Sequence, residues 1–256
     1  MANDRLAPAG ARSIERSVER LLSVQRPLVL AHLRRIRAQH PNADPAQVIA
    51  ILERRYLAAV TTGGAAVGAS AVIPGVGVGI SLALSGAETA GFLETSALFA
   101  QSVTEVHGIA VDDPERARTL VMAMMLGSAG SDLVKQLAEQ AAGTGNTRRQ
   151  FWGELVTTSL PKAAMGQIGS RIRRAFLRRF TATQGANVIG RVIPFGVGAV
   201  IGGVGNRLLG RKVVASSRTA FGPPPAEFPL VLGPRIYPAR RNGIQRRLGE
   251  RTDAVK

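Results

Sequence analysis

Apolar residues recur at spacings of three and four through most of the chain, which is the spacing that predicts helices. Residues 13–24 and 27–40 each carry such a pattern, and a third begins after Asp44. The third start is clear, because Asp44 can accept a hydrogen bond from the first turn, Pro45 suits the first helical position and Gln47 can bond back. The pattern predicts an all-α protein, a helical bundle whose short connections favour antiparallel neighbours.

The longest uncharged stretch, residues 56–87, follows directly. Pro74 lies near its middle, close to Gly75 and Gly77, and a proline inside a helix removes a hydrogen bond and clashes with the preceding turn. We therefore expect a first apolar hairpin over residues 56–92, with a tight turn at Pro74. Each arm of about 15 residues is short for a membrane span, so the hairpin is either a buried part of a soluble core or a segment that dips into a bilayer.

A second apolar hairpin is expected at residues 186–206, where Pro194 repeats the position of the first proline. Both hairpins contain glycines four positions apart, and such pairs let another helix backbone approach closely. We expect the two hairpins to pack on each other through these small residues. The residues concerned are Gly64 and Gly68 in the first hairpin, and Gly198, Gly202 and the closing Asn206 in the second.

No motif for catalysis, a metal or a cofactor is found. The sequence has no phosphate-binding loop, no zinc-protease spacing and no serine-hydrolase elbow. Asp112 and Asp113 precede Pro114, and this order is typical of a capped helix start. His107 is expected to be a capping or surface group where a helix ends. We therefore expect a protein that is not an enzyme, with no catalytic residues, metal or cofactor.

The net charge of +16 is concentrated in the last third of the chain. Residues 166–256 hold 17 Lys and Arg against 3 Asp and Glu, whereas residues 1–165 hold 16 against 14. This excess favours an anionic partner, either lipid headgroups or nucleic acid. The alternative is that the arginines reflect a GC-rich bacterial genome. The absence of cysteine excludes disulfides and thiolate sites, and the charged N-terminal residues predict no secretory signal, hence a cytoplasmic protein.

Residues 167–180 predict a basic amphipathic helix. Ile168, Ile172 and Phe176 fall on one face, and arginines occupy the rest: Arg171, Arg173, Arg174, Arg178 and Arg179. Such a helix suits an anionic membrane surface. The alternative is a surface helix whose charges are solvated or paired. The rest of the organisation is a disordered N-terminus over residues 1–12, one α-helical domain over residues 13–221, and a disordered Pro/Arg-rich tail over residues 222–256.

The two hairpins resemble the EcsC protein family. The similarity rests on the Gly/Ala-rich run at residues 63–68, the turn at residues 73–77, the segment around residues 107–114 and the closing segment at residues 193–206. It covers roughly residues 45–221. The resemblance implies an α-helical protein with a membrane-linked accessory role, since the family takes its name from a gene beside an ABC transporter. It implies no reaction.

The leading hypothesis is a non-enzymatic helical protein associated with the inner face of the cell membrane, where it binds anionic lipid or a membrane protein. One alternative is a soluble helical module that binds a protein or an apolar ligand between the hairpins. Another is a nucleic-acid-binding protein that acts through the basic tail, with strong salt dependence. The sequence gives no indication of the oligomeric state.

Overall fold

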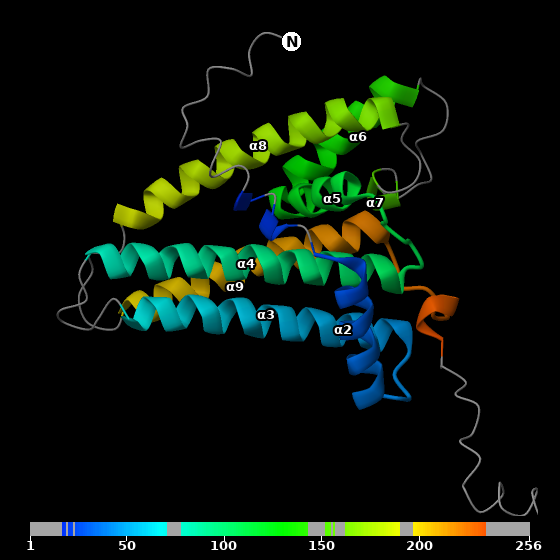
Figure 1. The fold of residues 1–256 in the computed structure, drawn as a ribbon, viewed down its shortest axis with the longest axis horizontal. Coiled ribbons are helices and arrows are strands. Elements are labelled where there is room, and N and C mark those ends of the chain that lie inside the picture. Colours follow the sequence, from blue (N-terminus) through cyan, green and yellow to red (C-terminus); the bar gives the residue numbers. More distant parts are fainter. Residues whose placement is uncertain are drawn as a thin grey trace, which may run out of the picture.

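Helices make up most of the computed structural model, which describes residues 17–18, 20–22, 24–70, 78–142, 152–154, 156, 162–189 and 197–233 (Figure 1). No strand occurs among these residues, so the predicted all-α fold is confirmed. The order along the chain is α2 (Arg26–Gln39), α3 (Pro45–Ser70), α4 (Val78–Val106), α5 (Pro114–Leu126), α6 (Ser128–Ala142), α7 (Trp152–Glu154), α8 (Lys162–Ile189), α9 (Val197–Phe221) and the short 3-10 helix η3 (Leu230–Leu232).

Two helix starts form as their capping residues predict. The backbone N–H of Gln47 donates to Asp44 Oδ1 at 2.7 Å, and the Asp44 N–H donates to Gln47 Oε1 at 3.1 Å. This reciprocal pair satisfies two backbone donors that a helix start otherwise leaves without partners. At α5 the cap is Asp113, whose Oδ1 accepts from the Glu115 N–H at 2.8 Å.

The first hairpin is longer than its apolar stretch suggests. α3 has 26 residues and α4 has 29, so the prediction of arms of about 15 residues is wrong. The reason is that the helix begun at Pro45 continues without a break into the uncharged stretch, and α4 runs on to Val106. The predicted turn residues Pro74, Gly75 and Gly77 lie outside the described residues.

α9 packs along α3, and α4 lies against α3 on another side (Figure 1). Two glycines of α9 lie close to α3. A Cβ built on Gly203 would be 3.3 Å from the Ala65 Cβ and from the Thr61 carbonyl oxygen. One built on Gly210 would be 3.0 Å from Val60 Cγ2. Of these two, Gly203 lies in the second predicted hairpin and faces the first, whereas Gly210 lies beyond it. The structure describes no such contact for the predicted glycines Gly64, Gly68, Gly198 and Gly202.

α5 is the central helix of the fold. It contacts α4, α6, α8 and α9, and residues all around its circumference are buried, among them Thr119, Val121, Met122 and Met124. Its first turns carry the charged residues Glu115, Arg116 and Arg118, but residues 119–124 are all buried, and a helix segment buried on every side belongs in a core. α5 thus joins the α3, α4 and α9 group on one side to α6 and α8 on the other (Figure 1).

α8 covers the far side of α5. Over the residues that the structure describes, α8 lies against α5 and α6, while α9 lies along α3. The second predicted hairpin, residues 186–206, falls mainly on residues whose surroundings are outside the described part. Pro194 is among the residues not described, and Gly198 and Gly202 lie in α9 without described surroundings.

The beginning of the C-terminal segment is ordered. Residues 222–233 turn back from α9 towards α2, beginning at Gly222 with a φ of 72°. The Arg37 guanidinium lies 4.2 Å from the centre of the Phe228 ring, and the Leu232 side chain is 1% exposed. The expectation of a disordered tail is therefore wrong for residues 222–233, because Phe228 and Leu232 anchor a proline-rich segment to the core. Residues 234–256 lie outside the described residues, as do residues 1–12.

Candidate functional site: an end pocket and two basic helices

A pocket of about 370 Å³ lies where the start of α3 meets the ends of α4 and α9. Its wall is mainly apolar and comes from Ala46, Ile49 and Ala50 of α3, Val103 of α4 and the prolines that follow α9. The polar groups in the lining are Glu53, His107, Ser217 and Arg218. An apolar cavity with a few convergent polar groups is the usual form of a small-molecule site.

Glu53 and Arg218 form a two-pronged ion pair beside this pocket. Arg218 Nε donates to Glu53 Oε1 at 2.8 Å, and Arg218 Nη2 donates to Oε2 at 2.5 Å. Hydrogen bonding to Glu53, together with its negative charge, raises the pKa of Arg218. The side chain of Glu53 is 11% exposed and that of Arg218 is 67% exposed. The pair links α3 to α9, and both residues line the pocket.

His107 contributes an imidazole to the pocket lining. Its Nδ1 lies 2.9 Å from the Val103 carbonyl oxygen and donates to it, which leaves Nε2 as an acceptor; Nε2 is buried and has no hydrogen-bond partner. Burial lowers the pKa of His107, although backbone groups of Val103, Gly222 and Pro223 favour the charged ring. The ring is therefore neutral near pH 7. It also lies 5.2 Å from the Phe221 ring, centre to centre.

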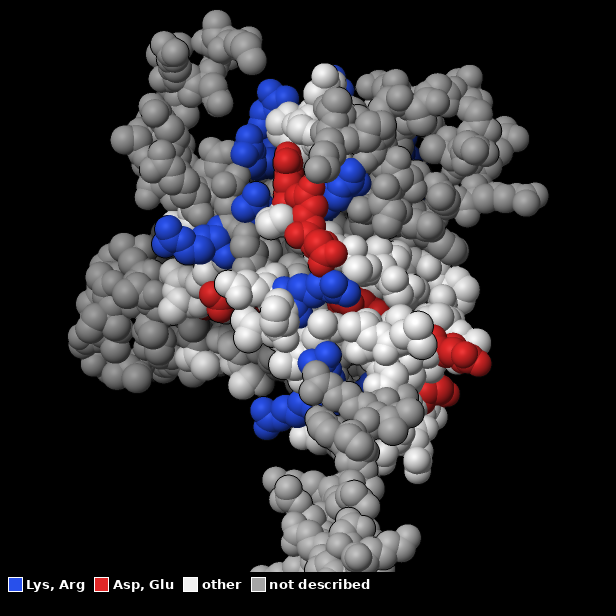
Figure 2. Space-filling model, turned by 45° about the vertical axis from the view of Figure 1, so that its right-hand side comes forward, with Lys and Arg blue, Asp and Glu red and all other residues white. Residues whose placement is uncertain are grey.

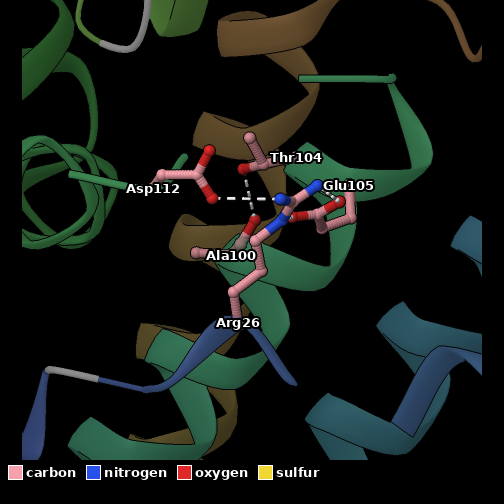
Figure 3. A network of polar contacts seen from close by, with 5 residues as sticks. All are labelled: Arg26, Ala100, Thr104, Glu105 and Asp112. Carbon is pink, nitrogen blue, oxygen red and sulfur yellow. Dashed lines mark hydrogen bonds and ion pairs between the residues drawn. The ribbon is translucent and has the colours of Figure 1, made fainter. Parts of the chain in front are cut away.

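A second polar cluster joins α2 to the end of α4 (Figure 3). Arg26 Nε donates to Glu105 Oε1, and Arg26 Nη1 donates to Asp112 Oδ1 at 3.0 Å. The Glu105 side chain is 5% exposed, so its charge requires this partner. The nearby Thr104 hydroxyl donates to the Ala100 carbonyl at 2.8 Å. These contacts join α2 to the end of α4 and to the segment before α5, so the cluster has a structural role.

The basic helix predicted at residues 167–180 lies within α8. Its apolar face is buried against the core, since Ile168, Ile172 and Phe176 are each at most 4% exposed. The predicted lipid-contacting arginines differ in exposure: Arg171, Arg174, Arg178 and Arg179 are exposed, whereas Arg173 is half-buried. Arg174 Nε donates to the Ser170 carbonyl at 3.3 Å, and Arg173, Arg178 and Arg179 each interact with other groups. This part of α8 thus exposes positive charge, while Ile168, Ile172 and Phe176 belong to the core.

The charges on the face drawn in Figure 2 are of both signs. Acidic side chains form a column there, with Lys and Arg on either side. This face therefore carries both negative and positive charge. The cations that remain without an ion pair among the described residues include Arg207, Arg211 and Lys212, which are exposed on α9.

The remaining predicted residues serve packing where the structure describes them. Gly64 is buried in α3, while the surroundings of Gly68 are not described. Asn206 Nδ2 donates to Glu88 Oε1 of α4 at 3.0 Å. Sequence reasoning missed the Glu53–Arg218 pair and the contacts of Gly203 and Gly210, because each depends on how α9 lies against α3 and has no local signal.

Neither a metal site nor a membrane span is found in the described part of the chain. No group of three or more His, Asp or Glu residues there could hold a metal ion. None of the described helices has the length and apolar run needed to cross a membrane.

No protein-family model, curated protein or solved structure matches this chain. The resemblance to the EcsC family therefore stays a prediction, and the function has to be argued from the geometry above.

Proposed function

We propose that the protein is a non-enzymatic accessory factor that attaches peripherally to anionic lipid at the cytoplasmic face of the membrane. The observation that carries the proposal is the arrangement of α8, which exposes Arg171, Arg174, Arg178 and Arg179 while its apolar side is buried. Such a helix binds a surface through charge. Each cation near an anionic leaflet adds about 1 kcal/mol, so the four together support reversible attachment.

Flotation with vesicles tests the proposal. The full-length protein is expected to float with vesicles that contain about a third anionic lipid, to stay behind with neutral vesicles, and to be released by about 1 M salt, where the Debye length falls to ~3 Å. Replacing the four exposed α8 arginines by serine is expected to weaken binding by roughly tenfold or more. Equal flotation with neutral and anionic vesicles, or none with either, contradicts the proposal.

A matched control removes the same number of charges from another surface. Four exposed arginines on α2 and α3 serve for this: Arg34, Arg35, Arg54 and Arg55. Their replacement by serine is expected to lower vesicle binding by less than the α8 replacement does. Equal losses would show that net charge alone, and no particular helix, determines binding. Circular dichroism of both variants confirms that each is folded before flotation is compared.

The pocket favours a second candidate function, binding of a small apolar ligand. Ile49 and Val103 provide apolar contact in its wall. A medium-chain alcohol such as 1-octanol is a suitable probe, with the thermal midpoint as readout. Ala50→Trp fills the pocket and is expected to abolish stabilisation by the alcohol. Ala58→Trp, at an exposed α3 position outside the lining, is the control.

A further inference from the structure

The outward face of α9 combines exposed apolar and basic side chains. Val204 and Leu208 lie one helical turn apart and are 51% and 53% exposed. Residues four apart lie on the same face of a helix, so the two side chains form one apolar stripe. Leu209 is also exposed, at 44%, but lies about 100° further round the helix and is not part of this stripe.

Cations border this stripe on both sides. At 100° per residue, Arg207 and Arg211 fall on one side of the line through Val204 and Leu208, and Lys212 falls on the other. All three are exposed and make no ion pair with another described residue. The acidic residue that α9 contacts nearby is Glu88, bonded to Asn206, and Asn206 lies on roughly the opposite side of the helix from Val204. The stripe is thus apolar at its centre and positive at its edges.

We propose that this face of α9 is the surface that enters the headgroup region of an anionic bilayer. The inference rests on the proposed function, in which the α8 arginines attract the anionic surface, and adds a face whose apolar side chains enter it. Helices that lie in a membrane interface have this composition, with apolar residues towards the acyl chains and Lys or Arg towards the headgroups. Over the part of α8 whose side chains are described, the first property is lacking, because Ile168, Ile172 and Phe176 are buried in the core. α9 has both.

Charge complementarity favours lipid over a second copy of the chain. A two-fold symmetric dimer through this stripe would place Arg207, Arg211 and Lys212 of one copy near the same residues of the other. Like charges so close to one another oppose association. An anionic bilayer supplies the opposite charge along both edges and an apolar layer for Val204 and Leu208.

The absence of cysteine from the chain allows a direct test. Leu208→Cys, labelled with a polarity-sensitive nitrobenzoxadiazole dye, reports on the stripe. Leu28→Cys is the matched control, because Leu28 is also an exposed helical leucine, 61% exposed, but lies on α2. With vesicles of about a third anionic lipid, the dye at position 208 is expected to brighten several-fold, to shift to shorter wavelength and to be quenched by nitroxide-labelled lipid. The dye at position 28 is expected to change little.

The outcomes separate this inference from the proposed function. Protein that floats with anionic vesicles while the dye at position 208 stays unchanged overturns α9 docking but leaves lipid attachment in place. Protein that does not float overturns both. Brightening at position 208 with rising protein concentration and no vesicles assigns the stripe to self-association and also overturns the inference. Val204→Ser with Leu208→Ser, which retains every cation, is expected to weaken vesicle binding by roughly tenfold.

Discussion

Arg218 on α9 holds the nearly buried carboxylate of Glu53 on α3 through two hydrogen bonds, across 165 positions of the sequence. The two partners are unequally exposed, because the Arg218 side chain is 67% exposed and the Glu53 side chain is 11% exposed. Removing one of them therefore has a different consequence from removing the other.

Arg218→Ala is expected to lower the free energy of unfolding by about 2 kcal/mol, since it leaves a nearly buried carboxylate without its partner. Glu53→Ala is expected to lower it by about 1 kcal/mol, because Arg218 can turn to water. Urea denaturation of the two variants measures the difference. A larger loss in Glu53→Ala than in Arg218→Ala would contradict this interpretation of the pair.

Gly210→Val is expected to destabilise the protein by about 1–3 kcal/mol, because a side chain there meets Val60 and Leu57 of α3. Gly63→Ala is the control, since a Cβ at this α3 position has no neighbour within 4 Å. It is expected to stabilise the protein by about 0.5–1 kcal/mol, as alanine favours a helix over glycine. Thermal unfolding gives both values. A stable Gly210→Val variant would show that α9 can move away from α3 at little cost.

Asp113→Ala is expected to lower the free energy of unfolding by about 1 kcal/mol, because the Glu115 N–H loses its acceptor. Its neighbour Asp112 is 76% exposed and pairs with Arg26 near the surface. Asp112→Ala is therefore expected to have an effect below about 0.5 kcal/mol. Urea denaturation of the two variants distinguishes the capping hydrogen bond from a general effect of negative charge near the helix start. Equal losses of stability would favour the charge effect.

Stability is expected to fall as the pH drops from about 7.5 to about 5.5, because burial lowers the pKa of His107 in the folded protein. In this window the unfolded chain, with a histidine pKa near 6.5, binds the proton first. The contribution is thus complete about one pH unit above the unfolded pKa of about 6.5, and it is lost as the pH falls through that value towards the lowered pKa of the folded protein. Burial also lowers the pKa of His32, with Arg55 and Arg35 adding to the shift, so His32 acts in the same direction.

His107→Asn is expected to flatten this pH dependence, with His32→Asn as the comparison and the urea midpoint at each pH as the measurement. If the urea midpoint changes with pH equally in His107→Asn and in the unchanged protein, the protonation of His107 is not the cause of the pH dependence.

The features predicted from the sequence are the ones that local chemistry determines. Asp44 and Asp113 start their helices as expected, because a cap needs only residues within one turn. The helical pattern of residues 27–40 also matches α2, since its apolar spacing is independent of what covers it.

The features that were missed depend on contacts between distant segments. The Gly203 and Gly210 contacts follow from how α9 lies on α3, and the pocket needs three helix ends in one place. The basic pattern of α8 left open what its apolar face meets, and the structure places α5 there. Prolines at residues 223–225 suggested disorder, but Phe228 and Leu232 a few positions later hold the segment against the core.

The packing of α3 on α9 has a consequence for the order of folding during synthesis. α3 leaves the ribosome long before α9 is synthesised. The α3 surface that later contacts Gly203 and Gly210 therefore stays uncovered until then. Contacts between such distant segments slow folding, and a chain that waits with apolar surface exposed is prone to aggregate. The nascent protein therefore completes its core only when the last helix has been made. Its yield in a cell depends on how well the apolar surface of the first hairpin is kept from aggregating until then.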